Sequence, residues 1–310
     1  MIASLAKRGR LYPPTTASVG GVPTNDIDTP ICAVFIFLYI CFAATNMTIL
    51  QKNRRLNHKF IISGAMFGFC MARTTTLVLR IAWANRSHNV RLAIAANILV
   101  NAGILLIYII NIILSQRILR AKQPRIGWHP VLRVGIKILY CLIPGALIMV
   151  IVSTVVQLYS PSPQVHASCC DVLLAAATLL LVFTCVPIVQ LTVAMLFPRH
   201  NDEETFGAGT MRAKVLIVTL SSCMCIIIAG FKAGSLWSPP RPLHNPAWYH
   251  SKACFYAFNF MLEILILCVL TFSRIDKRFY IPNGSTKQGD YSHTTLEVSD
   301  TVMADLEGKT

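Results

Sequence analysis

Charged side chains are scarce in this chain. Lys, Arg, Asp and Glu make up 13% of its 310 residues, about half the share found in an average soluble domain. The shortage falls on the acids, with 13 Asp and Glu against 28 Lys and Arg. This composition excludes an ordinary water-soluble domain. The 55% hydrophobic residues and the mean hydropathy of +0.58 are typical of an integral membrane protein.

Motifs that carry common enzyme and cofactor chemistry are also missing. The sequence has no HExxH zinc motif, no phosphate-binding glycine loop and no nucleophile elbow. All eight His lie in predicted loops, tails or helix edges, so no pair can clamp a haem inside a bundle. No Lys lies in the middle of the last apolar segment, which excludes a retinal Schiff base there. We therefore expect a protein that is not an enzyme, holds no metal and needs no cofactor.

The formal charge of +15 does not point to nucleic acid. The cations fall mainly between the apolar runs, where the positive-inside rule puts them in a membrane protein. The charge distribution thus predicts the lipid bilayer as the partner of this chain. The expected location is the plasma membrane or an endomembrane.

Long apolar runs predict an all-α, polytopic fold with seven membrane-spanning helices, since each run can cross a hydrocarbon core of about 30 Å. The predicted spans are residues 30–50, 60–83, 92–114, 131–158, 172–197, 213–231 and 252–273. They define a seven-helix transmembrane domain over residues 30–278. The polar tails at 1–29 and 279–310 are expected to be disordered.

The loop cations predict the orientation. Fourteen Lys and Arg residues lie on the side that follows the first span, against eight on the other side. Because cytoplasmic loops carry the excess of positive charge, the N-terminus is predicted to be outside or lumenal and the C-terminus cytoplasmic.

Two charged residues fall near the middle of predicted spans. Arg73 lies in the 60–83 span and Glu263 in the 252–273 span, at similar depth. A charge at the bilayer centre costs about 2.5–3.5 kcal/mol on an insertion scale unless it finds a partner, so these two are predicted to pair. Arg80, nearer the outer end, is expected to extend outward. Glu263 has an alternative partner in Lys232 or in an Asn of the third span. The pair either locks two helices together or forms part of a ligand site.

The third span adds amides to this polar spot. Asn97 and Asn101 are four residues apart and share a helix face, and Asn101 is predicted near mid-membrane. They serve either as interhelical hydrogen-bonding groups or as part of the site with Arg73 and Glu263.

The outer side carries two further candidate features. Cys169 and Cys170, predicted in the loop before the fifth span, share that side with Cys254, so a disulfide can form between the loop and the last span; free thiols are the alternative. Asn85, in the sequence Asn-Arg-Ser, is a candidate for glycosylation.

Several stretches resemble a group of fungal multi-pass membrane proteins. They are PPRPLHNPAWYHSKACFYAFNF (239–260), RIDKRFYIPNGS (274–285), HKFIISGAMFGFCMAR (58–73) and IGWHP (126–130). Such proteins are often labelled family C-like G-protein-coupled receptors. At the level of seven helices and a charged, aromatic last span, the chain is also similar to fungal lipid-translocating exporters of the aminocholesterol-resistance type. These resemblances transfer no binding residue.

Two function classes follow. The first is a receptor-like sensor of an unknown ligand, with a cytoplasmic signalling partner at its basic loops and Ser/Thr-rich tail. The second is a lipid or amphiphile translocator or resistance protein, in which the polar spot handles a headgroup.

The orientation gives a direct prediction. Asn85 should face the lumen or exterior and Thr310 the cytosol, because of the cation bias. A reporter that can be glycosylated, fused after Thr310, should remain unmodified in cells. A glycosylated C-terminal reporter would reverse the topology.

Overall fold

The computed structural model describes residues 17–56, 58, 60–86, 89–159, 162–197, 204–242, 244–282, 285 and 289–291. Residues 1–16 and 292–310, which include most of the two predicted tails, lie outside the described residues. Within the described ranges the structure consists of helices and connecting turns, and none of its elements is a strand.

Seven of the helical stretches are long and apolar enough to cross a membrane, which confirms the predicted fold class. Their bounds are α2 Asn25–Arg55, α3 Ile61–Asn85, α4 Val90–Gly103 with α5 Leu105–Lys122, α7 Pro130–Tyr159, α8 Pro163–Leu196, α9 Met211–Trp237, and α10 Lys252–Tyr256 with α11 Leu262–Phe272. The length and composition of these helices make the chain an integral membrane protein, with seven candidate spans among the described residues.

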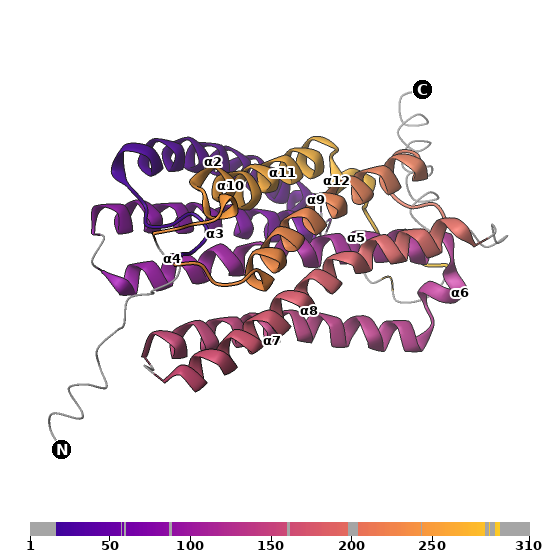
Figure 1. The fold of residues 1–310 in the computed structure, drawn as a ribbon. Coiled ribbons are helices and arrows are strands. Elements are labelled where there is room, and N and C mark those ends of the chain that lie inside the picture. The colour runs from indigo at the N-terminus through magenta and orange to yellow at the C-terminus, as the bar shows by residue number, and fades with distance from the viewer. Residues whose placement is uncertain are drawn as a thin grey trace, which may run out of the picture.

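The helices run side by side along a common direction (Figure 1). In the view of Figure 1, α2 and the last span lie at one side of the bundle and α7 lies at the other. The third span, made of α4 and α5, is the most buried of the seven and packs against α3, α8 and α9. Polar side chains reinforce it, since Asn111 Nδ2 lies 3.2 Å from Cys225 Sγ of α9 and Ser115 Oγ donates to Gln190 Oε1 of α8 at 2.6 Å.

Two spans are interrupted. The third span breaks at Ile104, where α4 ends and α5 begins. The last span contains a π-helical segment, Ala257–Met261, between α10 and α11. Irregular turns of this kind alter which side chains face the interior and are frequent at functional sites. The hydropathy pattern did not predict either interruption.

The short elements complete the ends. They are α6 Pro124–Gly127, the 3₁₀ turn Trp248–His250, and α12 Ile275–Arg278. Pro144 and Pro187 lie inside α7 and α8, and both helices continue through them.

Parts of the predicted tails are ordered. The helix α2 begins at Asn25, so residues 25–29 are helical, with Asp26 and Asp28 in its first turn, where carboxylates are favoured by the helix dipole. At the other end, Phe279 and Tyr291 are buried. Buried Glu204 accepts hydrogen bonds from the amides of Gly289 (2.8 Å) and Tyr291 (3.0 Å) and holds that segment to the bundle.

Candidate functional site

A buried ion pair joins α3 to the last span. Arg73 and Glu263 form a two-pronged contact, with Arg73 Nε donating to Glu263 Oε2 at 2.5 Å and Arg73 Nη2 donating to Glu263 Oε1. Both side chains have no exposed surface. The two parallel hydrogen bonds use the guanidinium geometry that makes Arg–carboxylate pairs strong. The structure thus brings together the two charges that the sequence predicted to meet.

The carboxylate has a second donor from α2. The hydroxyl of Tyr39 lies 3.2 Å from Glu263 Oε2, and the Tyr39 side chain is fully buried. Glu263 is therefore bonded from α2 and α3 at once. A buried carboxylate is tolerated only when its lone pairs are satisfied in this way.

Backbone carbonyls of α4 accept further hydrogen bonds from the guanidinium. Arg73 Nη1 donates to the carbonyls of Val100 (2.9 Å) and Leu99 (3.2 Å). The break in the third span makes one of them available, because the amide of Ile104 bonds to Ala102 and not to Val100, four residues back. The interruption of the helix thus creates an acceptor for the buried cation.

Glycine and aromatic side chains form the remaining walls. A Cβ at Gly103 would lie 3.0 Å from Arg73 Cζ, so only glycine leaves full room for the guanidinium there. The Arg73 Cζ also lies 5.5 Å from the ring centre of Phe69 and 5.6 Å from that of Phe260, which places the cation near two aromatic faces.

Lys232 adds a second cation beside the pair. Its Nζ lies 3.3 Å from both the Val100 carbonyl and Asn101 Oδ1. Arg73 and Lys232 therefore share one carbonyl, and the carboxylate of Glu263 pairs directly with Arg73 rather than with Lys232.

The two predicted amides lie at the edge of this cluster. Asn101 is exposed and reaches it only through Lys232; its own Nδ2 donates back to the Asn97 carbonyl at 3.1 Å. Asn97 is exposed too, and the structure does not bring its side chain to the ion pair. Of the two alternatives for these amides, Asn101 fits interhelical hydrogen bonding, through Lys232 of α9, and among the described residues neither amide is bonded to Arg73 or Glu263.

A second charged cluster lies toward the outer end and was not predicted. Asp28 of α2 is fully buried and accepts from Arg80 Nη2 (3.0 Å), Lys252 Nζ (2.6 Å) and the Tyr256 hydroxyl (2.6 Å). Arg80 is 2% exposed, and its Cζ lies 4.0 Å from the ring centre of Phe255. Arg80 does not extend outward as expected, since Asp28 offers a buried partner.

The two clusters connect the same elements. Both join α2 and α3 to the last span, at two different depths. The sequence did contain a signal for this cluster. Asp28 is a carboxylate at the outer end of the first span, and Arg80 is a cation at the outer end of the second span, so the two could have been predicted to pair. Tyr39 gave no such signal, because a tyrosine in an apolar run is most often a core residue.

The cysteines do not form the predicted disulfide. All eleven are free thiols. The helix α8 starts at Pro163, so Cys169 and Cys170 lie within a helix rather than in a loop. Cys170 Sγ faces Gln157 of α7 (3.5 Å), whereas Cys254 Sγ faces the Trp248 carbonyl (3.6 Å). The thiols therefore have different neighbours. Of the two alternatives, a disulfide or free thiols, the structure has free thiols.

Asn85 is the last residue of α3 and is exposed. Its Nδ2 lies 3.3 Å from the Ile81 carbonyl, one turn back. Its use as a glycosylation site stays a prediction. Among the described residues, no group of three or more His, Cys, Asp or Glu is placed to hold a metal ion.

Comparison with known proteins matches part of the chain to a family model. A family described as "Protein of unknown function (DUF3112)" matches residues 209–280, which is less than half of the chain. The matched region runs from the start of α9 through the last span and includes Lys232 and Glu263. No curated protein and no solved structure matches the chain.

The ion pair predicts a marked asymmetry between single and double substitutions. Arg73→Met or Glu263→Leu alone should lower the free energy of unfolding by about 3–5 kcal/mol, because each leaves an unpaired buried charge. The double substitution should cost far less than the sum of the two. Thermal unfolding of the four proteins in one detergent measures this coupling. Additive losses would show that the two side chains do not act as a pair.

The room left by Gly103 predicts a second effect. Gly103→Ala should destabilise the protein by about 1–3 kcal/mol, since the guanidinium is held on its other side and cannot move away. Gly68→Ala, on the same helix as Arg73, meets no atom within 4 Å and should be neutral or stabilising. Equal changes in the free energy of unfolding for the two substitutions would show that Gly103 is not needed to leave room for the guanidinium.

Proposed function

We propose that this integral membrane protein is a receptor-like seven-helix sensor, in which a change at the outer end is transmitted along α2 and the last span to the opposite end. The observation that carries the proposal is a row of buried polar contacts between these two elements. Its ligand is unknown, and the proposal assigns the outer side to the N-terminus from the cation distribution.

The row follows one face of α2. After Asp28, the buried polar side chains Tyr39 and Asn46 lie seven residues apart, and buried Asn53 continues this spacing without a side-chain bond to the last span among the described residues. Tyr39 meets Glu263, and Asn46 Nδ2 donates to Thr271 Oγ1 at 3.3 Å. A seven-residue repeat keeps one helix face against one neighbour over its whole length.

Such a row supports transmission because hydrogen-bonded interfaces have discrete alternative arrangements. A helix that rotates or shifts must exchange one set of polar partners for another, so intermediate positions leave buried groups unpaired at a cost of about 1–3 kcal/mol each. A ligand that favours one arrangement at the Asp28 cluster would then bias the packing of the whole interface.

The closed middle of the bundle also favours a sensor over a translocator. A lipid headgroup that crosses the membrane needs a polar route open to it, and Arg73, Glu263 and Tyr39 have no exposed surface. In the alternative function, lipid or amphiphile translocation, these groups would have to become accessible during transport.

A cytoplasmic signalling partner is part of the proposal. Exposed cations at the end that the topology assigns to the cytoplasm would attract an acidic partner surface. They include Lys52, Arg54, Arg55, Arg274 and Lys277.

Hydrogen–deuterium exchange of the purified full-length protein in nanodiscs tests the proposal. Asp28→Asn weakens the outer cluster through loss of its charge while keeping its shape. We expect faster amide exchange not only near residue 28 but also in residues 204–210 and 274–280, at the opposite end, because the α2 interface loosens as a unit.

The matched control is Asp171→Asn, an exposed carboxylate of α8. It should leave exchange at residues 204–210 and 274–280 unchanged. A response to Asp28→Asn that stays near residue 28 would contradict the sensor proposal. Faster transfer of a fluorescent phospholipid between leaflets in proteoliposomes than in empty liposomes would favour the translocator instead.

A further inference from the structure

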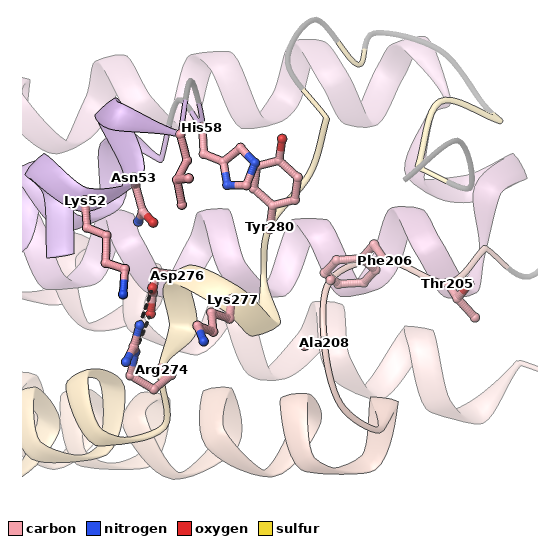
Figure 2. A pocket seen from close by; sticks show the side chains of 12 residues that line it. Lys52, Asn53, His58, Thr205, Phe206, Ala208, Arg274, Asp276, Lys277 and Tyr280 are labelled. Carbon is pink, nitrogen blue, oxygen red and sulfur yellow. Dashed lines mark hydrogen bonds and ion pairs between the residues drawn. The ribbon is translucent and has the colours of Figure 1, made fainter. Parts of the chain in front are cut away.

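A cavity of about 620 Å³ opens at the end of the bundle opposite to the Asp28 cluster. It is bounded by the C-terminal end of α2, the turn before α9, and the α12 region. Figure 2 shows Lys52 extending from α2 toward Arg274, Asp276 and Lys277, with Phe206 and Thr205 at the other end of the cavity. This end of the protein is the one that the cation distribution assigns to the cytoplasm.

The charges around the cavity are unbalanced. Lys52, Arg274 and Lys277 line it together with a single carboxylate, Asp276. That carboxylate is already bonded by Arg274, with Nε–Oδ1 and Nη2–Oδ2 distances of 3.1 and 3.0 Å. Within the part of the chain that the structure describes, neither lysine has a carboxylate partner. The cavity therefore favours an anion.

A buried amide points to the same ligand. Asn53 is 9% exposed and lines the cavity, and its Nδ2 has no hydrogen-bond partner. An unpaired buried N–H costs free energy, and an anionic ligand in the cavity would supply the acceptor that it lacks. Beside Lys52, this amide gives a neutral donor next to a cation.

A separate apolar groove lies next to the cavity, along the membrane-spanning region. It lies between α2 and α11, has a volume of about 460 Å³, and is lined by Ala44, Thr45, Thr48, Ile49, Thr271 and Phe272. Arg274 lines both the groove and the cavity, so the two meet at this residue. Thr45, Thr48 and Lys52 follow one another on one face of α2, which leads from the groove to the cavity.

Arg274 is fixed at this junction. Its φ of 50° is the one left-handed value among the non-glycine residues of the described chain. The bond to Asp276 holds its side chain, and the turn that it makes separates α11 from α12. A conformation of this kind costs free energy and is kept where its surroundings require it.

We propose that the cavity and the groove together bind one anionic phospholipid from the leaflet at this end of the protein. The phosphate lies between Lys52 and Lys277 and accepts a hydrogen bond from Asn53 Nδ2, and one acyl chain follows the groove between α2 and α11. A soluble phosphate compound would leave the groove without a ligand, which is why we assign the site to a lipid. Basic pockets at cytoplasmic helix ends suit such headgroups. The inference does not depend on the sensor function.

Thermal unfolding of the full-length protein in detergent micelles tests the proposal. Dioctanoyl phosphatidic acid should raise the melting temperature by several degrees in a saturable manner, because it binds the folded state. Dioctanoyl phosphatidylcholine, which carries a compensating positive charge, should have much less effect. Glycerol 3-phosphate, the same headgroup without acyl chains, should also have little effect at equal concentration.

The variant Lys52→Gln/Lys277→Gln should bind phosphatidic acid roughly thirtyfold more weakly, from the contribution of two lysines near a membrane surface. The matched control is Arg133→Gln/Lys137→Gln, two exposed cations of α7, which should keep full binding. Unchanged binding in the first variant, or an equal loss in the second, would overturn the proposal. Equal binding of glycerol 3-phosphate would assign the cavity to a soluble phosphate and overturn the lipid assignment.

Asn53→Leu separates binding from folding. Without lipid this protein should be as stable as the original or more stable, because an unpaired amide is replaced by an apolar group of similar size. With phosphatidic acid its increase in melting temperature should be smaller. If the variant is less stable without lipid but shows the full increase in melting temperature with phosphatidic acid, the amide stabilises the fold and has no role in the lipid site.

Discussion

The pairing of Arg73 with Glu263 is the constraint on which the arrangement of this bundle depends. Two opposite charges with no exposed surface cannot separate without leaving a bare charge in a low-dielectric interior. The pair therefore fixes the depth of α3 relative to the last span. Through the Tyr39 hydroxyl and the Val100 carbonyl it fixes α2 and α4 as well.

The irregularities of the fold are arranged around this pair. The break at Ile104 provides a carbonyl acceptor, Gly103 leaves space, and the π-helical segment Ala257–Met261 ends directly before Leu262 and Glu263. The outer cluster at Asp28 also neutralises a buried carboxylate by ion pairing, nearer the membrane surface. There one carboxylate pairs with two cations. The proposed sensor function uses the interface that these two clusters share, and the proposed lipid site lies where that interface reaches the other end of the bundle.

The spans and the central pair could be predicted because hydropathy and the cost of an isolated charge act locally in the sequence. Arg73 and Glu263 were the opposite charges nearest mid-membrane, so their pairing followed from energetics alone. The start of α8 could not be predicted in this way, since residues 163–171 contain Gln164, His166 and Asp171 and have the composition of a loop. That error placed Cys169 and Cys170 in a loop, where a disulfide with Cys254 was one of two alternatives, and the free thiols of the structure are the other. The roles of Gly103 and Val100 depend on a helix break that leaves no mark in the hydropathy pattern.

The most direct test of the central claim is the ionisation state of Glu263 in the membrane. Infrared difference spectra between the wild-type protein and Glu263→Gln, both in nanodiscs, resolve the carboxyl group of this side chain. We expect the substitution to remove intensity from the ionised carboxylate bands, because the contact with Arg73 favours the charged form of Glu263. Loss of a protonated carboxylic acid band would mean that Glu263 is neutral, and would contradict a structure built around a buried ion pair.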